Sequence, residues 1–306
     1  MSARIHLLPN SRCTIGENPL WDAEEDRLYW IDVAAGNIFC GTPDGREVRL
    51  WRFPWGTISS LALRASGGAI VTAANGIHLL DLDTGEIDTL FQVDSKPGVG
   101  FNDAKVDRQG RLVTGLVDGT QLQTAPGSST LVEAAGLYRV DHDLEVRPLA
   151  EGFIASNGPS FSPDGTILYW NDSWALRTYA FDYDPETGVA SNRRQFADFI
   201  DPTQPVQPMP DGSTVDEEGF LWTAALYAGE IRRYAPDGTL DRRISLPLMK
   251  PLGVAFGGPE MEVLYVTTMG DAGFPGDPLQ TGVLDGSILA LSGLGVRGIP
   301  ERRFAG

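Results

Sequence analysis

Four oxygen-bearing side chains, far apart along the chain, stand at one common interval before a predicted tight turn. The interval is that between Asp211 and Gly219, and it recurs before Glu25, Gly110 and Gly165. The side chains that it reaches are Glu17, Asn102, Asn157 and Asp211. Carboxylate and amide oxygens are the ligands that hard divalent cations prefer. A fold that brings these positions together would therefore create a metal site.

Each of these residues taken alone has an ordinary structural explanation, because Asn and Asp often begin turns. Taken together, two carboxylates at one point would repel each other, and one would have to stay protonated. A divalent cation removes that repulsion. We therefore expect Glu17, Asn157 and Asp211 to bind one divalent metal ion directly, with coordination positions left for water and substrate. Oxygen ligands do not choose among Ca²⁺, Mg²⁺, Mn²⁺, Zn²⁺ and Fe²⁺.

The interval is set by a hairpin, which residues 210–222 show most clearly. A short alternating run leads into an acidic turn closed by Gly219, and Phe220, Leu221 and Trp222 lead out of it. Alternation, an acidic turn with Gly and a bulky return run predict an antiparallel β-hairpin. The turn itself has no need of the carboxylate of Asp211.

The hairpin belongs to a predicted four-stranded unit that occurs six times. The units cover residues 20–53, 59–93, 102–152, 157–199, a fifth that begins at residue 210, and 251–290. Repeats of this length and strand content are typical of a β-propeller. We expect an all-β fold, a six-bladed β-propeller with four-stranded antiparallel blades, that forms one domain over residues 1–306. Residues 4–8 are predicted to supply the outer strand of the last blade, next to residues 301–304.

The innermost strands of a propeller all begin near its axis on one face, so equivalent positions form a ring. The same interval reaches Ser60 and Lys250 in the two remaining units. The predicted ring consists of Glu17, Ser60, Asn102, Asn157, Asp211 and Lys250. Two carboxylates and two amides would then converge on one axial point.

Composition and charge exclude several classes of partner. The chain has 306 residues and a formal net charge of −17, which disfavours nucleic acids and anionic membranes. No stretch approaches the roughly 20 apolar residues of a membrane span, and residues 1–20 show no secretory signal. The only cysteines, Cys13 and Cys40, are more simply read as reduced thiols than as a disulfide framework. We expect a cytoplasmic protein with a small-molecule partner; no oligomeric state follows from the sequence.

Four short segments carry a resemblance to a known family. They are Gly16–Trp21, Phe101–Asp107, Ser156–Pro159 and Pro210–Gly212. Together they resemble the motifs of the senescence-marker-protein/gluconolactonase/luciferin-regenerating family, and the similarity runs nearly end to end. The resemblance implies a six-bladed propeller with one divalent metal in its central tunnel and activity on sugar lactones such as gluconolactone. It also implies that Glu17, Asn157 and Asp211 match the metal ligands, and that Asn102 matches a substrate-binding residue near the metal.

Two positions depart from the family's pattern. Many members have Arg two residues before the substrate-binding Asn, where this chain has Gly100. A second substrate-binding acid is expected in the loop after residue 115, and Asp118 is the candidate for it. The substrate preference is therefore expected to differ from that of the members that hydrolyse gluconolactone.

The expected chemistry is metal-assisted opening of a sugar-derived lactone to its aldonic acid. The metal would polarise the carbonyl and lower the pKa of bound water, with Asp211 as the general base. Asn102 would hydrogen-bond a ring hydroxyl or the carbonyl oxygen. One alternative is a related metal-dependent propeller hydrolase of phosphotriesters or other activated esters. The other is a calcium-binding or protein-binding propeller without turnover.

Other chemistry-bearing residues receive weaker assignments. His6, His78 and His142 lack metal-ligand spacing and are expected to be structural. Asp172 either supports Asn157 or a metal-bound water, or has no role in the site. Trp55, Trp174 and Tyr227 are expected to serve core or rim packing rather than to line the mouth of the tunnel.

Overall fold

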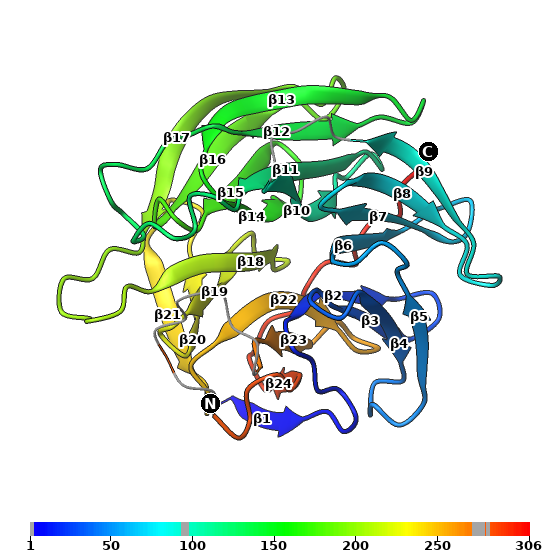
Figure 1. Ribbon diagram of the computed structural model, residues 1–306. Helices are drawn as coiled ribbons and strands as arrows, with labels where there is room; N and C mark the ends of the chain where they lie inside the picture. The colour runs from blue at the N-terminus through cyan, green and yellow to red at the C-terminus, as the bar shows by residue number, and fades with distance from the viewer. Residues whose placement is uncertain (1–2, 93–97, 271–278, 280–281) are drawn as a thin grey trace.

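The computed structural model describes residues 3–92, 98–270, 279 and 282–306. Over these residues, six four-stranded antiparallel sheets stand around a central axis as the blades of a propeller (Figure 1). The predicted fold class is confirmed. These ranges contain no helix, and so none that is long and apolar enough to cross a membrane.

In blades 1 to 5 the four strands follow one another from the axis outward (Figure 1). Blade 1 contains β2 (Gly16–Asp22), β3 (Arg27–Asp32), β4 (Asn37–Gly41) and β5 (Val48–Arg52). Blade 2 contains β6 (Ile58–Leu63), β7 (Ala69–Ala73), β8 (Gly76–Leu80) and β9 (Ile87–Gln92). Blade 3 contains β10 (Val99–Val106), β11 (Leu112–Asp118), β12 (Ala135–Val140) and β13 (Val146–Phe153). Blade 4 contains β14 (Ser156–Phe161), β15 (Ile167–Asp172), β16 (Arg177–Tyr183) and β17 (Ala190–Asp198). Blade 5 contains β18 (Met209–Val215), β19 (Leu221–Leu226), β20 (Glu230–Tyr234) and β21 (Leu240–Ser245).

Blade 6 closes the ring with strands from both ends of the chain. It contains β22 (Pro251–Gly257), β23 (Val263–Thr268), β24 (Leu289–Ser292) and, outermost, β1 (Arg4–Leu7). The predicted use of the N-terminus as an outer strand is confirmed, since Arg4 pairs with Ser292 and Leu7 with Leu289. The predicted neighbour was wrong. Residues 301–304 lie away from this blade, and Phe304 forms a bridge to Arg64 beside blade 2.

The hairpin of blade 5 has the predicted boundaries. β18 ends at Val215 and β19 begins at Leu221, and Gly219 adopts a positive φ of 84° in the turn between them. Asp216 holds this turn, because its Oδ1 accepts hydrogen bonds from the backbone N–H groups of Glu218 and Phe220, both at 3.0 Å. Asx turns of this kind explain why acidic residues precede the glycine.

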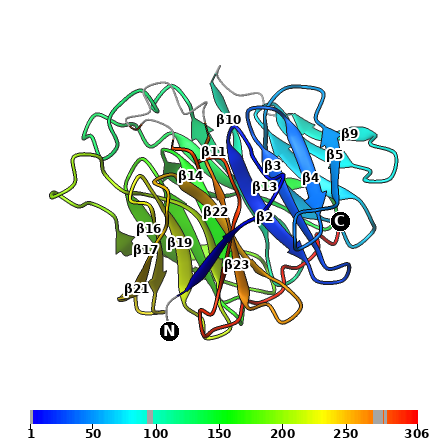
Figure 2. The same cartoon turned by 90° about the horizontal axis from the view of Figure 1, so that it is seen from below.

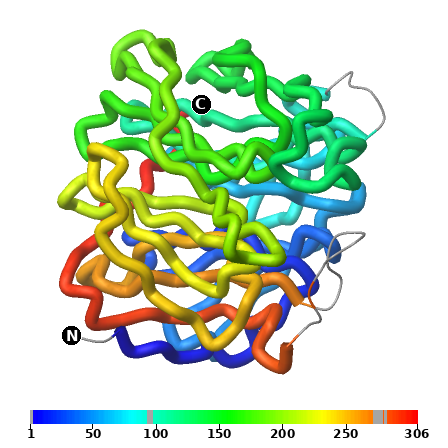
Figure 3. The backbone as a smooth tube through the Cα atoms, turned by 90° about the vertical axis from the view of Figure 1, so that its left-hand side faces the viewer, coloured from blue at the N-terminus to red at the C-terminus, as the bar shows by residue number. Residues whose placement is uncertain are grey.

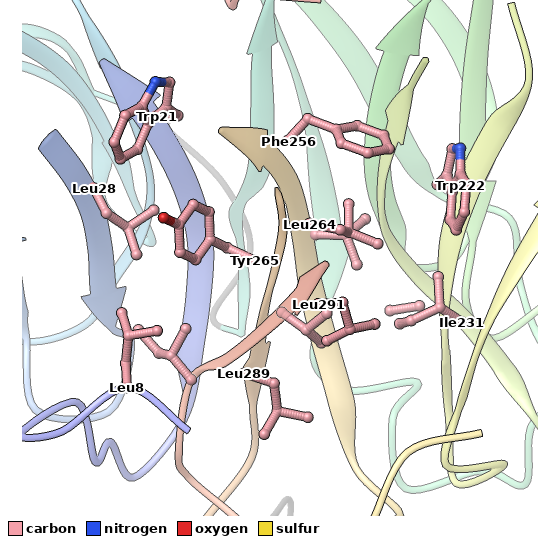
Figure 4. Close-up of a cluster of buried hydrophobic side chains, with 14 of the residues drawn as sticks. Leu8, Trp21, Leu28, Trp222, Ile231, Phe256, Leu264, Tyr265, Leu289 and Leu291 are labelled. Atoms are coloured by element: carbon pink, nitrogen blue, oxygen red, sulfur yellow. The ribbon is translucent and has the colours of Figure 1, made fainter. Parts of the chain in front are cut away.

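Neighbouring blades pack against each other through large hydrophobic side chains that lie between their sheets. Figure 4 shows one such cluster, in which β23 of blade 6 lies between strands of blades 1 and 5. Trp21 stacks on Tyr265 with ring centroids 5.8 Å apart, and Phe256 meets the edge of Trp222 at 5.6 Å. All four are at most 2% exposed, so the sheets hold the innermost strands in fixed positions around the axis.

Candidate metal centre

Every innermost strand carries one extra residue near its start, where it faces the axis. The shifts in strand register fall between Glu17 and Leu20, Ile58 and Ser60, Phe101 and Ala104, Asn157 and Ser160, Pro210 and Ser213, and Pro251 and Val254. Such β-bulges bend a strand and redirect a side chain. The six bulges therefore turn polar side chains out of the sheets at one level of the propeller.

The predicted ring is staggered with respect to these bulges. Glu17 and Asn157 are the last paired residues before the shift in their strands. Asn102 and Asp211 lie within the shift, one position after the last paired residue. Lys250 departs further, since it precedes β22. Its buried Nζ lies 3.9 Å from Oδ2 of Asp285 and donates to the carbonyl oxygen of Leu279 at 3.4 Å.

The bulges of blades 3, 4 and 5 are in direct contact. Nδ2 of Asn102 donates to Oδ1 of Asn157 and to the carbonyl oxygen of Ser156, both at 2.8 Å. Gly158 has φ +51°, and a Cβ there would lie 2.9 Å from the backbone nitrogen of Ser213 and overlap the carbonyl oxygen of Asp211. Only glycine allows this approach, which brings Asn157 and Asp211 together.

Three carboxylates lie near one another at this point. Burial raises the pKa of Glu17, and the charges of Asp211 and Asp103 raise it further. Burial and the charge of Asp103 likewise raise the pKa of Asp211. Burial is also the main cause that raises the pKa of Asp103. Each carboxylate would therefore favour protonation unless a cation neutralised the group.

Asp103 was missed as a site residue by the reasoning from sequence, which stopped at its neighbour Asn102. Its Oδ2 accepts a hydrogen bond from the backbone N–H of Gly158 at 3.0 Å, and its Oδ1 accepts one from Ala104 at 2.8 Å. The signal available was its place in the same motif as Asn102, because a bulge can turn consecutive residues to one side of a strand.

The donor set fits an oxygen-coordinated divalent ion. Oδ1 of Asp211 is buried and accepts no hydrogen bond within the described ranges, although buried carboxylate oxygens normally have partners. Oδ1 of Asn157 keeps one lone pair beyond the bond from Asn102. In the part of the chain that the structure describes, no three His, Cys, Asp or Glu side chains form a metal-binding group. A metal site here would thus depend on the amide oxygen of Asn157.

Two side chains at the end of β15 and in the turn after it orient the predicted ligands. Ser173 Oγ accepts a hydrogen bond from Nδ2 of Asn157 at 2.8 Å and donates to the carbonyl oxygen of Pro210 at 2.6 Å. Asn171 Nδ2 donates to Ser213 Oγ at 2.8 Å and also to the carbonyl oxygen of Asp211. Partners of this kind fix which atom of a ligand faces a metal.

Among the described residues, the carboxylate of Asp172 makes no hydrogen bond to the side chain of Asn157, and its role toward a metal-bound water stays a prediction. It accepts hydrogen bonds from the backbone N–H groups of Ile154, Ala155 and Ala175 at 2.9, 3.1 and 3.2 Å. Asp32 does the same in blade 1, with bonds from Thr14 at 2.7 Å and Ile15 at 3.1 Å. These two aspartates thus anchor the segments that lead into Asn157 and Glu17.

Gly100 lies on β10, and Asp118 lies at the end of β11, which pairs with β10. Oδ1 of Asp118 accepts bonds from the backbone N–H and the hydroxyl of Thr120, at 3.0 and 2.6 Å, so the contribution of Asp118 to substrate binding stays a prediction. A Cβ on Gly100 would lie 2.7 Å from Cα of Ala74. The backbone of blade 2 therefore leaves no space for a side chain at the position where many family members have Arg.

The remaining candidates have structural contacts. His78 is buried, with ring nitrogens 3.1 Å from Oδ1 of Asn75 and 3.2 Å from Oγ1 of Thr89. His6 pairs with Ala290 in blade 6, and the His142 ring nitrogen lies 2.9 Å from the carbonyl oxygen of Gln109. The aromatic residues are packed as expected: Trp55 against His78, Trp174 against the loop at Thr124, and Tyr227 in a buried cluster.

Comparison with known proteins decides the family. A sequence profile of the SMP-30/Gluconolactonase/LRE-like region matches residues 15–270. The chain belongs to this family. Regucalcin from Xenopus laevis is 32% identical over 307 residues, covering 100% of this chain and 99% of the relative. Pentonolactonase XacC from Haloferax volcanii is 32% identical over 267 residues, covering 86% of this chain and 84% of the relative. The solved structure of luciferin-regenerating enzyme superposes with a TM-score of 0.88 at 25% identity, over 99% of both chains.

The resemblance inferred from the motifs is thereby confirmed. Membership of the family, together with a pentonolactonase among the relatives, supports a lactonase-type propeller.

Proposed function

We propose that this protein is a metal-dependent lactonase that opens a sugar-derived lactone to its aldonic acid. The observation that carries the proposal is the buried Oδ1 of Asp211, which accepts no hydrogen bond from any described residue and lies among two other carboxylates and beside the Asn102–Asn157 amide pair. The relatives named as a pentonolactonase and as regucalcin are consistent with it. Buried free thiols at Cys13 and Cys40 favour a cytoplasmic setting. A sugar-lactone substrate would place the protein in carbohydrate metabolism.

Glu17, Asn157 and Asp211 would hold the divalent ion. When bound, that ion would supply Lewis acidity toward the lactone carbonyl and make water more acidic. The protein's own residues supply the rest. Hydrogen bonds from Asn171 and Ser173 to the Pro210–Asp211 backbone hold the strand that carries the base. Asn102, on the neighbouring bulge, would bind the substrate through its Oδ1, which can accept a hydrogen bond from a ring hydroxyl, since both N–H groups of its amide already donate to Ser156 and Asn157.

In the hydrolysis itself, the oxygen of water bonds to the acyl carbon and the ring C–O bond breaks. Asp211 takes one proton from the attacking water as the general base. The departing ring oxygen receives a proton and becomes a hydroxyl of the aldonic acid. Ionised at neutral pH, the product carboxylate leaves a net proton in solution, which makes the reaction measurable with a pH indicator.

The test uses chelator-stripped protein reconstituted separately with Ca²⁺, Mg²⁺, Mn²⁺, Zn²⁺ and Fe²⁺. A panel of pentono- and hexonolactones and one phosphotriester is assayed with each ion. We expect metal-dependent lactone opening in the wild type and loss of about 10²-fold or more in Asp211→Asn. Asp83→Asn, which changes an exposed turn carboxylate, is the matched control and should keep wild-type activity.

Three results would overturn the proposal. The first is lactone opening that survives in Asp211→Asn. The second is cleavage of the phosphotriester alone, which would favour the other class of propeller hydrolase. The third is metal binding without turnover of any compound, which would indicate a calcium-binding or protein-binding propeller.

A further inference from the structure

The C-terminal segment, residues 297–306, crosses the face of the propeller opposite to the bulges (red in Figures 2 and 3). It meets the far ends of innermost strands in several blades. Gly298 bridges to Asp216 after β18, and Phe304 bridges to Arg64 after β6. The backbone N–H of Ala305 then donates to the carbonyl oxygen of Gly110 in blade 3 at 2.9 Å.

A cavity of about 520 Å³ lies between this segment and the first turns of the blades. Its walls are mixed in character. Leu20, Pro163 and Ile299 contribute apolar surface, and three arginines contribute charge: Arg108, Arg302 and Arg303. The volume is within the range of pockets that hold small organic ligands.

The carboxylates around this cavity already have cationic partners. Nη2 of Arg303 donates to both oxygens of Asp22 at 2.8 and 2.9 Å and lies 3.1 Å from Oε2 of Glu24. Glu301 is paired with Nζ of Lys105 at 2.8 Å. Each of these wall carboxylates thus forms its ion pair with a cation other than Arg108 or Arg302.

Arg108 and Arg302 have no carboxylate partner within the described ranges. Nε and Nη2 of Arg108 donate to the backbone carbonyls of Ser162 and Phe161, at 3.2 and 2.9 Å, which fixes the plane of the guanidinium. Arg302 is exposed and makes no hydrogen bond or ion pair with any described residue. Burial is the main cause that lowers the pKa of Arg108; the charge of Arg302 also lowers it, whereas the charges of Glu301, Asp107 and Asp164 oppose the lowering.

We propose that Arg108 and Arg302 form a binding site for a small organic anion that carries a phosphate or carboxylate group. An anion in this cavity would receive charge-assisted hydrogen bonds from the N–H groups of Arg108 and Arg302 that donate to no described residue. The apolar wall formed by Leu20, Pro163 and Ile299 would contact its carbon skeleton. The site lies on the face opposite to the metal centre and stands whether or not the lactonase proposal holds.

The experiment is isothermal titration calorimetry of the intact, metal-loaded protein in low-salt buffer, because salt screens exposed charges. The probes are inorganic phosphate, glucose 6-phosphate and gluconate. We expect at least one organic anion to bind the wild type, and its affinity to fall about tenfold or more in Arg302→Gln. Binding of glucose 6-phosphate alone would identify a phosphate site, and binding of gluconate alone a carboxylate site.

Arg46→Gln is the matched control, since it removes the same charge from an exposed arginine paired only with Asp44. Arg302 contributes no described contact to the fold, so its variant tests binding without a loss of folding. The double variant Arg108→Gln/Arg302→Gln, checked by circular dichroism, should abolish binding. The proposal is overturned if no probe binds the wild type, or if Arg302→Gln and Arg46→Gln bind equally well.

Discussion

At the scale of single residues, the side-chain amide of Asn157, a predicted metal ligand, is held in one orientation by its hydrogen bonds. Its Nδ2 donates a hydrogen bond to Ser173, which leaves its Oδ1 to accept the bond from Asn102. The same serine donates to the carbonyl oxygen of Pro210, next to Asp211. One hydroxyl therefore connects two of the predicted ligands, which come from different blades.

Replacing Ser173 by Ala should make both predicted metal ligands, Asn157 and Asp211, less well held in position. Without the hydroxyl, Nδ2 of Asn157 and the carbonyl of Pro210 are left unpaired, which costs about 1–3 kcal/mol of folding free energy. Metal affinity should fall about 10- to 100-fold, the usual effect of removing a group that holds a ligand. Calorimetric titration of stripped protein measures this. Ser191→Ala on the exposed strand β17 is the control, and equal affinity in the two variants would contradict the role of Ser173.

At the scale of elements, the geometry of the candidate metal centre depends on bulges rather than on regular strands. A bulge at every innermost strand lets neighbouring blades approach so closely that glycine is required at the contact points. Besides Gly158, this holds for Gly212, where a Cβ would lie 2.7 Å from Cα of Gly253. The turns that follow the same strands are held by buried aspartates such as Asp216.

Comparing Gly158→Ala with Gly295→Ala separates two reasons for glycine: lack of space for a Cβ and a backbone with positive φ. A Cβ on Gly158 would lie 2.6 Å from Nδ2 of Asn171 and overlap the carbonyl oxygen of Asp211, so blades 4 and 5 must separate. Gly295→Ala also places Ala at positive φ, 78°, but meets no atom within 4 Å. We expect Gly295→Ala to cost about 1 kcal/mol and Gly158→Ala at least about 3 kcal/mol, with loss of metal binding. Urea denaturation compares them; equal losses would show that the blades do not constrain this position.

At the scale of the whole molecule, both end segments of the chain contribute to holding the ring of blades together. β1 completes blade 6 from the N-terminal side. The C-terminal segment ties blades 5, 2 and 3 together on the opposite face, with Phe304 fully buried at its end. The two ends of the chain thus restrain the blades around the tunnel from different sides.

Phe304→Ala should weaken the attachment of the C-terminal segment to the blades. Removing a fully buried phenylalanine side chain costs about 3–5 kcal/mol, through lost burial and the cavity that remains. Chemical denaturation of the variant measures the loss. Val283→Ala, at a residue 87% exposed, is the control and should change stability by less than about 0.5 kcal/mol. A loss as small as that of the control would show that the segment is not needed for stability.

The three crowded carboxylates also predict how stability depends on pH. The pKa values of Glu17, Asp103 and Asp211 are raised in the folded protein. Their contribution to stability is therefore fully present below the unfolded pKa of about 4 and is lost as the pH rises through the raised values. A divalent ion binds the ionised forms, so the increase in Tm on adding metal should grow from pH 4 upward. Thermal unfolding at several pH values, with and without metal, tests this; a pH-independent increase would be inconsistent with carboxylate ligands.

The sequence by itself determined the six repeats, the hairpin around Gly219 and the common interval that selects Glu17, Asn102, Asn157 and Asp211. Alternation and turn chemistry are local, and repetition makes local patterns comparable between blades. Only the tertiary structure decided that Asp103 lies near Glu17 and Asp211 and that Ser173 hydrogen-bonds the side chain of Asn157. The same is true of the C-terminal segment, which crosses the far face instead of joining blade 6. These features depend on which backbone passes beside which, between residues far apart in the chain, and no local pattern records that.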